Sequence, residues 1–170
     1  MSGRSEALVA CLMEIERHVA SSGWDQPARL FALVPTVELI AAEPALAAHL
    51  GPPTSPDALS SVEQEGFGAG EDPVDALALI AWPATVHGCA MALERTFLPP
   101  DAEADLTTDP QDHARIVAAH PRRMDVRVVV GASRDGTRHG VGRLRTHPDE
   151  LLAGPDLVPG LASALARTLE

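Results

Sequence analysis

One stretch of the chain constrains the fold more than any other. Residues 126–145 alternate valine with charged and small residues on either side of Asp135-Gly136, a dipeptide that strongly favours a β-hairpin. The length of the turn decides which side chains share a face of the sheet. A two-residue turn would place Arg143 and Arg145 opposite valines on the apolar face, where burial of two unpaired charges would be costly.

A longer turn avoids this cost, and the sequence therefore predicts it. With a three-residue loop from Arg134 to Gly136 and the glycine left-handed, Leu144 lies opposite Val126. Gly140 and Gly142 then fall on the core face, where a helix can approach closely. We expect that helix to be the one at residues 161–169. The other face of the hairpin is expected to carry Arg127, Arg143 and Arg145, pointing away from that helix and into solvent.

The remaining sequence alternates helix and strand signals. A short apolar run at 29–34 and a long stretch at 86–98, apolar on one face, indicate strands, and Thr146-His147-Pro148 resembles a helix start. Prolines and glycines punctuate the segment at about 51–72, which predicts a long mobile loop. The chain is thus predicted to be one globular α+β domain, residues 1–170, with helices packed on an antiparallel sheet of about four strands. The predicted order is α-β-α-α-β-α-β-β-α, with helices near 5–23, 37–50 (kinked at Pro44), 73–80, 109–120 and 161–169.

The charge of the chain is acidic and uneven. The formal net charge is −11, which argues against a protein that coats nucleic acid or an anionic membrane. All thirteen basic residues are arginines, and eight of them fall between His113 and His147 against two aspartates, a local charge of +6 that leaves −17 on the remainder. Guanidinium groups suit carboxylate or phosphate oxygens, so the arginine-rich region is a candidate binding surface, the alternative being a solvated face of the sheet without a partner. Its residues are Arg122, Arg123, Arg127, Arg138, Arg143 and Arg145.

No catalytic motif emerges from the residues. The glycine run 66–70 lacks the spacing of a phosphate-binding loop, and Ser133 precedes a hairpin turn rather than the helix of a nucleophile elbow. Cys11 and Cys89 fall on apolar faces, which suits buried thiols. The seven histidines show no metal-ligand spacing, and the acidic run 101–112 promises no fixed pair of carboxylates. We therefore expect no cofactor and no metal.

A polar stretch at the entry to the first strand is the alternative site. Trp24, Asp25, Gln26 and Arg29 would be its main polar contributors if the chain were a small hydrolase or a ligand-binding enzyme with a site dispersed in sequence. The simpler interpretation is structural. In that case Trp24 anchors the first helix to the sheet, and Asp25 caps the turn.

Three stretches of sequence carry a resemblance to a known family: residues 24–34 (WDQPARLFALV), 81–95 (AWP, GCA and ER) and 154–161 (GPDLVPGL). On these the chain resembles an uncharacterised family of small acidic actinobacterial proteins known mainly by a locus name, over most of its length except 51–72. That resemblance implies no chemistry, because the family has no established activity. The chain is also similar to the type III secretion chaperone-like fold, although its strand order departs from helix, three strands, helix, two strands, helix. This second similarity implies a peptide-binding or dimerising role.

These observations predict a non-enzymatic protein-interaction module. Its expected partner is a protein or an acidic peptide, and a second copy of the chain would fit because the acidic and arginine-rich surfaces are complementary. Nucleic acid is disfavoured, since the hairpin has no aromatic residue for base stacking. Arg4 and Glu6 interrupt any secretory apolar run, and no stretch approaches the roughly 20 apolar residues of a membrane span. We therefore expect a cytoplasmic location and no membrane partner.

Overall fold

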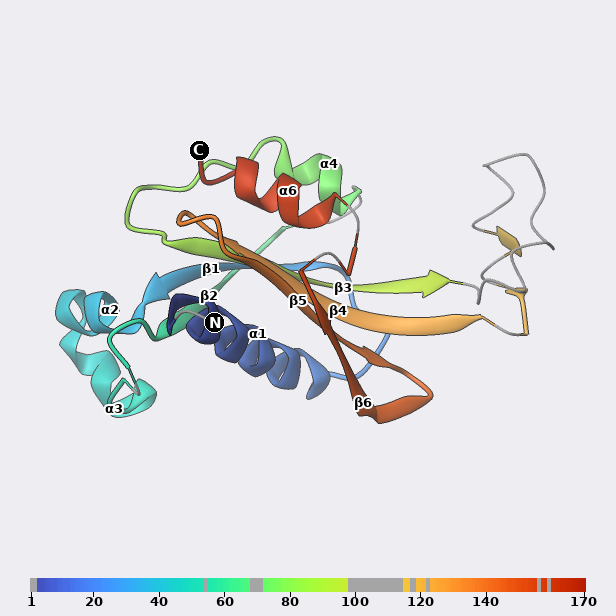
Figure 1. Ribbon diagram of the computed structural model, residues 1–170, viewed down its shortest axis with the longest axis horizontal. Helices are drawn as coiled ribbons and strands as arrows, with labels where there is room; N and C mark the ends of the chain where they lie inside the picture. Colours follow the sequence, from blue (N-terminus) through green and yellow to red (C-terminus); the bar gives the residue numbers. More distant parts are fainter. Residues whose placement is uncertain are drawn as a thin grey trace.

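The computed structural model describes residues 3–53, 55–67, 72–97, 115–116, 119–121, 123–155, 157–158 and 160–170 of the chain. Within these residues, six strands form one antiparallel sheet, which is the middle layer of the protein (Figure 1). The strands are β1 (Arg29–Pro35), β2 (Leu59–Gln64), β3 (Gly88–Phe97), β4 (Met124–Ser133), β5 (Arg138–Leu144) and β6 (His147–Gly154). They lie in the order β2-β1-β3-β4-β5-β6.

The α+β class and the antiparallel sheet are as predicted, but the expectation of about four strands is wrong. β2 lies inside the segment 51–72, where we expect a loop, and β6 begins at His147-Pro148, which resembles a helix start. Both are edge strands. An edge strand buries little of either face, so its sequence lacks the apolar pattern that marks a central strand. The two strands without that pattern are the two that sequence reasoning misses.

Helices cover both faces of the sheet (Figure 1). α1 (Gly3–Ala20) lies along one face, and α6 (Leu161–Arg167) with the short α4 (Pro73–Leu77) lies on the other. Between β1 and β2 the chain forms α2 (Thr36–Ala42), a 3-10 turn (Pro44–Leu46) and α3 (Ala47–Leu50), so the helix expected at 37–50 does break at Pro44. The helix expected at 109–120 falls mostly outside the described residues. None of the described helices is long and apolar enough to span a membrane.

Each face of the sheet has its own apolar core, because successive side chains of a strand point to opposite faces. The core under α1 contains Leu8, Cys11, Leu12, Ile15, Val19, Phe31, Leu33, Ala90, Ala92, Val129 and Val141. The core under α6 includes Leu30, Cys89, Met91, Leu93, Val128, Val130, Leu161 and Leu165. Alternate residues of a central strand therefore face α1 and α6 in turn.

The β4–β5 hairpin has the register that the charge argument favours. Val126 pairs with Leu144, and Gly136 in the turn has a φ of 91°, which is the left-handed region. Gly140 and Gly142 pair with Val130 and Val128 on the α6 face, as predicted. Avoidance of two buried charges was enough to choose the turn.

The close helix approach expected over Gly140 and Gly142 lies elsewhere. α6 packs on β3 and β4, and Leu157 covers Gly140, with its Cδ1 3.4 Å from where a Cβ would stand. The tight approach is on the opposite face, at Gly131 of β4. A Cβ added there would lie 2.7 Å from Cδ2 of Leu12 in α1. A glycine at this position is what lets α1 settle so closely on the sheet.

Candidate functional site

The two groups of candidate residues meet at one place, the C-terminal end of α1. Arg127 on β4 and Arg143 on β5 are cross-strand partners, and both contact α1 or the loop that follows it. The arginines thus face away from α6 as expected. Their face of the sheet was expected to be exposed to solvent, but α1 and the loop after it cover it. We call this set of residues the α1-end cluster: Glu16, Trp24, Asp25, Gln26, Arg29, Arg127, Arg143 and Arg145.

Arg127 is buried in the α1-end cluster, with 3% of its surface exposed. Its guanidinium lies 4.4 Å from the centroid of the Trp24 ring, and its Nη2 donates to the carbonyl oxygen of Gly23 at 2.5 Å. The buried Nε has no hydrogen-bond partner. An arginine held between an aromatic face and a backbone carbonyl ties the loop after α1 to the sheet. It offers no surface to a partner protein.

Arg143 pairs with a buried carboxylate that sequence reasoning overlooks. Its Nε lies 2.6 Å from Oε1 of Glu16 in α1, and the Glu16 side chain is 2% exposed against 28% for Arg143. No hydrogen bond of acceptable geometry reaches that oxygen, so the contact is an ion pair rather than an aligned hydrogen bond. The sequence does contain a pattern that indicates the burial of Glu16. Glu16 follows Leu12 by four residues and precedes Val19 by three, which places it on the buried stripe of α1.

Arg145 lies at the exposed rim of the α1-end cluster. Its guanidinium is 5.5 Å from the Trp24 ring centroid, and its Nη1 is 3.5 Å from Oδ1 of Asp25. Both charged side chains are well exposed, so this ion pair contributes little stability. Two arginines of the hairpin therefore approach one half-buried tryptophan, and Trp24 joins the chain that follows α1 to the sheet.

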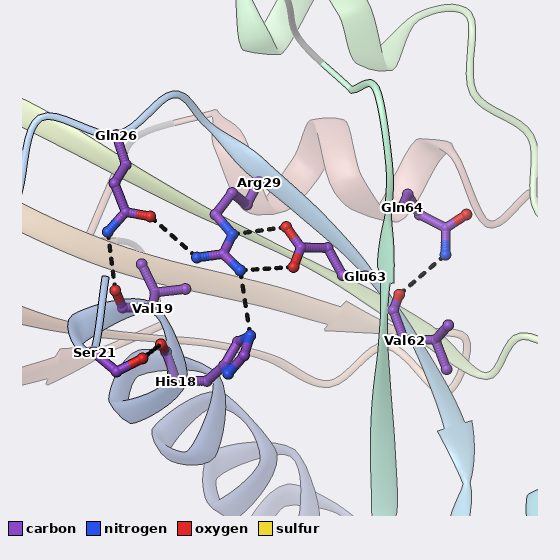
Figure 2. A network of polar contacts seen from close by, with 8 residues as sticks. All are labelled: His18, Val19, Ser21, Gln26, Arg29, Val62, Glu63 and Gln64. Atoms are coloured by element: carbon purple, nitrogen blue, oxygen red, sulfur yellow. Dashed lines mark hydrogen bonds and ion pairs between the residues drawn. The ribbon is translucent and has the colours of Figure 1, made fainter. Parts of the chain in front are cut away.

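Gln26 and Arg29 belong to a polar network that reaches β2 (Figure 2). Arg29 donates from Nε and Nη2 to the two carboxylate oxygens of Glu63, at 2.7 and 2.6 Å, and from Nη1 to Oε1 of Gln26 at 3.0 Å. Nε2 of His18 lies 3.2 Å from Arg29 Nη2. The hydrogen bonds from Arg29 hold the pKa of Glu63 below its usual value. The amide of Gln26 donates in turn to the Val19 and Gly23 carbonyl oxygens.

Glu94 on β3 fastens the loop backbone to the sheet. Its two carboxylate oxygens accept the backbone N–H groups of Asp25 and Gln26, each at 2.9 Å. Asp25 has a φ of 64°, a left-handed conformation that is uncommon outside glycine. The side chains of Gln26 and Arg29 and the backbone of Asp25 are thus engaged with one another, with α1 or with the sheet, and this arrangement holds the loop in place.

The outer arginines are spread over other parts of the protein. Arg138 donates to Oγ of Ser163 at 3.0 Å, and Arg123 donates to the His120 carbonyl oxygen at 3.4 Å. Arg122 lies outside the described residues, as does the acidic run 101–112. The structure therefore brings Arg127, Arg143 and Arg145 together and leaves Arg123 and Arg138 apart from them.

The two cysteines are buried free thiols, as the sequence predicts. Burial raises the pKa of Cys11 to about 12 and that of Cys89 to about 11. Such thiols are poor nucleophiles at neutral pH. Among the described residues, no group of three or more histidine, cysteine, aspartate or glutamate side chains could hold a metal ion.

The two edges of the sheet differ in how they are protected. β6 carries Pro148, Asp149 and Glu150, and its pairing with β5 shifts register between Arg143 and Leu144. Proline, charge and irregular pairing are the usual devices that prevent another strand from adding to an edge. β2 pairs with β1 without a register shift and contains no proline. The single charge of β2, Glu63, is neutralised by Arg29.

The direction of the β2 backbone groups follows from one hydrogen bond. Thr36 N–H donates to the Ala58 carbonyl oxygen at 2.8 Å, and this pair continues the β1–β2 register. Hydrogen-bonded and non-bonded pairs alternate along an antiparallel ladder, so even-numbered residues of β2 bond to β1. The N–H and C=O groups of Leu59, Ser61 and Glu63 consequently point to the free edge. β2 is the last strand of the sheet in the described part of the chain, so no described strand pairs with these groups.

In the residues that the structure describes, the fold is α+β: α1 and α6 lie on opposite faces of a six-stranded antiparallel sheet, and β2 is one of its edges. The chain belongs to the PPA1309-like protein family, whose family model matches residues 8–170. This confirms the resemblance to an uncharacterised family known by a locus name. No curated protein and no solved structure matches the chain, and the likeness to the type III secretion chaperone-like fold stays an expectation.

Proposed function

We propose that this chain is a non-enzymatic protein-interaction module that accepts an extended segment of a partner protein along the free edge of β2. The observation that supports the proposal is the contrast between the two edges. β6 has the features that exclude an added strand, whereas β2 presents the backbone groups of Leu59, Ser61 and Glu63 without them. Addition of a strand to an exposed edge is a common mode of peptide recognition.

The other candidate surfaces have less support. Self-association through an arginine face needs exposed arginines, yet Arg127 is buried and Arg143 faces the carboxylate of Glu16. A hydrolase at the 24–29 stretch needs free polar groups, yet Gln26 and Arg29 bond to neighbouring residues. We therefore place the proposed partner-binding surface at the β2 edge and not at the α1-end cluster.

Two further expectations belong to the same proposal. A peptide-binding role is also what the similarity to the type III secretion chaperone-like fold implies. A cytoplasmic location in an actinobacterium suits two buried free thiols, because the cytosol keeps cysteines reduced.

The test is a selection of random peptides displayed on phage against the wild-type protein. Selected peptides are then titrated against Ser61→Pro, which removes one outward N–H from the edge and leaves the β1–β2 ladder intact. Ser61→Ala is the matched control, because it keeps that N–H. We expect the peptides to bind wild type and Ser61→Ala alike, and to bind Ser61→Pro roughly tenfold more weakly, about 1.4 kcal/mol.

Hydrogen exchange gives an independent measurement on the wild-type protein. Binding should slow exchange of the Leu59, Ser61 and Glu63 amides, because these groups become paired. Peptides that bind Ser61→Pro as tightly as wild type, or a selection that yields no binder, would show that the edge is not a docking site. Urea unfolding of each variant confirms that it is folded before binding is compared.

A further inference from the structure

A groove of about 560 Å³ opens beside the Gln64 end of β2, on the face of the sheet that α6 covers farther along. Leu30 of β1 contributes to its lining, and the chain after α4 forms part of its wall. The lining is mostly apolar, with Gln64 and Glu65 at the β2 side. The larger apolar residues of the lining are Leu30, Phe67, Leu79, Ile80 and Trp82.

Two exposed apolar side chains lie at or beside the groove. Leu79 is 85% exposed, and Val62, which lies on the same face of β2, is 41% exposed. Side chains of an added strand alternate between the two faces. Every second side chain of a strand docked on β2 would therefore lie next to Val62 and the mouth of the groove, while the others would lie next to Ser61 and Glu63.

The charge around the groove selects the occupant. Among its described lining residues Glu65 is the one that is charged, and Asp72 and Asp75 of the neighbouring α4 region are exposed. A second copy of this chain would bring the same carboxylates and a formal net charge of −11 to the contact. Like charges that face each other across paired strands are destabilising. A basic segment has the complementary charge.

We infer that the partner segment is an extended strand with an apolar side chain in the groove and a lysine or arginine beside Glu65. This inference rests on the proposed function and adds the chemistry of the partner. Backbone pairing along Leu59, Ser61 and Glu63 supplies affinity for any strand, and the groove with Glu65 supplies the choice among strands.

The peptides from the phage selection test the inference in two ways. Their sequences should be enriched in apolar residues at alternate positions and in lysine or arginine between them. Calorimetric titration should show weaker binding to Leu79→Ser and to Glu65→Arg, each by roughly tenfold, which is the loss expected from one exposed leucine contact or one charge reversal. Both altered side chains are exposed, so neither substitution threatens folding.

The opposite edge supplies matched controls. Leu152→Ser removes a half-exposed leucine from β6, and Glu150→Arg reverses an exposed charge there. We expect both β6 variants to bind the selected peptides as wild type does. Equal weakening by the β2-side and β6-side variants would mean that net charge or general hydrophobicity governs binding, and the inference would be wrong.

The inference and the proposed function fail separately. Peptides that need the Ser61 edge but ignore Leu79→Ser and Glu65→Arg leave the module intact and exclude the groove. Selected peptides rich in aspartate and glutamate would contradict the charge argument. A dimer seen by light scattering in wild type and abolished by Ser61→Pro would assign the edge to a second copy of the chain and overturn the basic partner.

Discussion

Removal of the Arg143 side chain takes the counter-charge away from the buried carboxylate of Glu16. Glu16 has a 2% exposed side chain, and Arg143 Nε lies 2.6 Å from its Oε1. Loss of one partner of a fully buried pair costs about 3–5 kcal/mol, because the remaining charge is left without solvation. The Arg143 side chain is 28% exposed, so solvent already screens part of the attraction. We therefore expect Arg143→Ala to lower the free energy of unfolding by about 2–4 kcal/mol.

Urea unfolding followed by circular dichroism measures this effect, and a double-mutant cycle assigns it to the pair. Glu16→Gln keeps the shape of the side chain without its charge. If the pair carries the effect, Arg143→Ala should cost much less in the Glu16→Gln background than in wild type. Replacement of both residues by leucine should come close to wild-type stability, as is often found for buried ion pairs.

A solvated arginine face, which is the expectation from sequence, predicts a different number. Arg143→Ala would then change stability by less than about 0.5 kcal/mol, as surface substitutions usually do. A loss of that size, or equal losses in both backgrounds of the cycle, would refute the buried-pair reasoning.

The remaining predictions concern packing and titration. Gly131→Ala should destabilise the protein by about 1–3 kcal/mol in urea unfolding, because its Cβ would stand 2.7 Å from a side-chain carbon of α1. Cys11 and Cys89 should resist iodoacetamide in the folded protein at about pH 8 and react in urea. Their pKa values of about 12 and about 11 in the folded state exceed the ordinary 9.0, so stability should fall as the pH rises from 9 toward 11. Glu63→Gln should cost less than about 1 kcal/mol at neutral pH, since its pair with Arg29 is partly exposed. Because the Glu63 pKa is lowered, that cost should disappear as the pH falls below 4.5.

The sequence was most informative where burial left a clear pattern. Two unpaired charges on an apolar face excluded one hairpin turn, and the pairing of Val126 with Leu144 follows. The stripe of Leu8, Leu12 and Val19 likewise marks the face of α1 that meets the sheet. In both cases burial decided which face of the element the apolar or charged side chains occupy.

The sequence was least informative for elements that bury little. β2 has the sequence LSSVEQ, and none of its residues is fully buried, so no period of two distinguishes it from a loop. β6 has exposed residues along nearly all its length, and His147-Pro148 in it is typical of a helix start. The free edge at β2 was missed because β2 has no fully buried residue to mark it as a strand.

The predicted arginine face is covered by residues that lie far away in the sequence. Arg127 and Arg143 form a face of the hairpin only if nothing covers it, and the covering residues Trp24 and Glu16 come more than a hundred positions earlier. Hairpin register can place the arginines on a face. It cannot say which helix that face meets.

Two contacts between α1 and the sheet fix the spacing of residues along this helix. Leu12 must lie over Gly131 of β4, and Glu16 must reach Arg143 of β5, with one helical turn between the two contacts. A residue inserted between Leu12 and Glu16 would turn everything that follows by about 100° and advance it by about 1.5 Å. One contact could then form only at the expense of the other. The number of residues between Leu12 and Glu16 is therefore as constrained as the identity of the two residues. The first turn of α1, before Leu8, can change length without moving either contact.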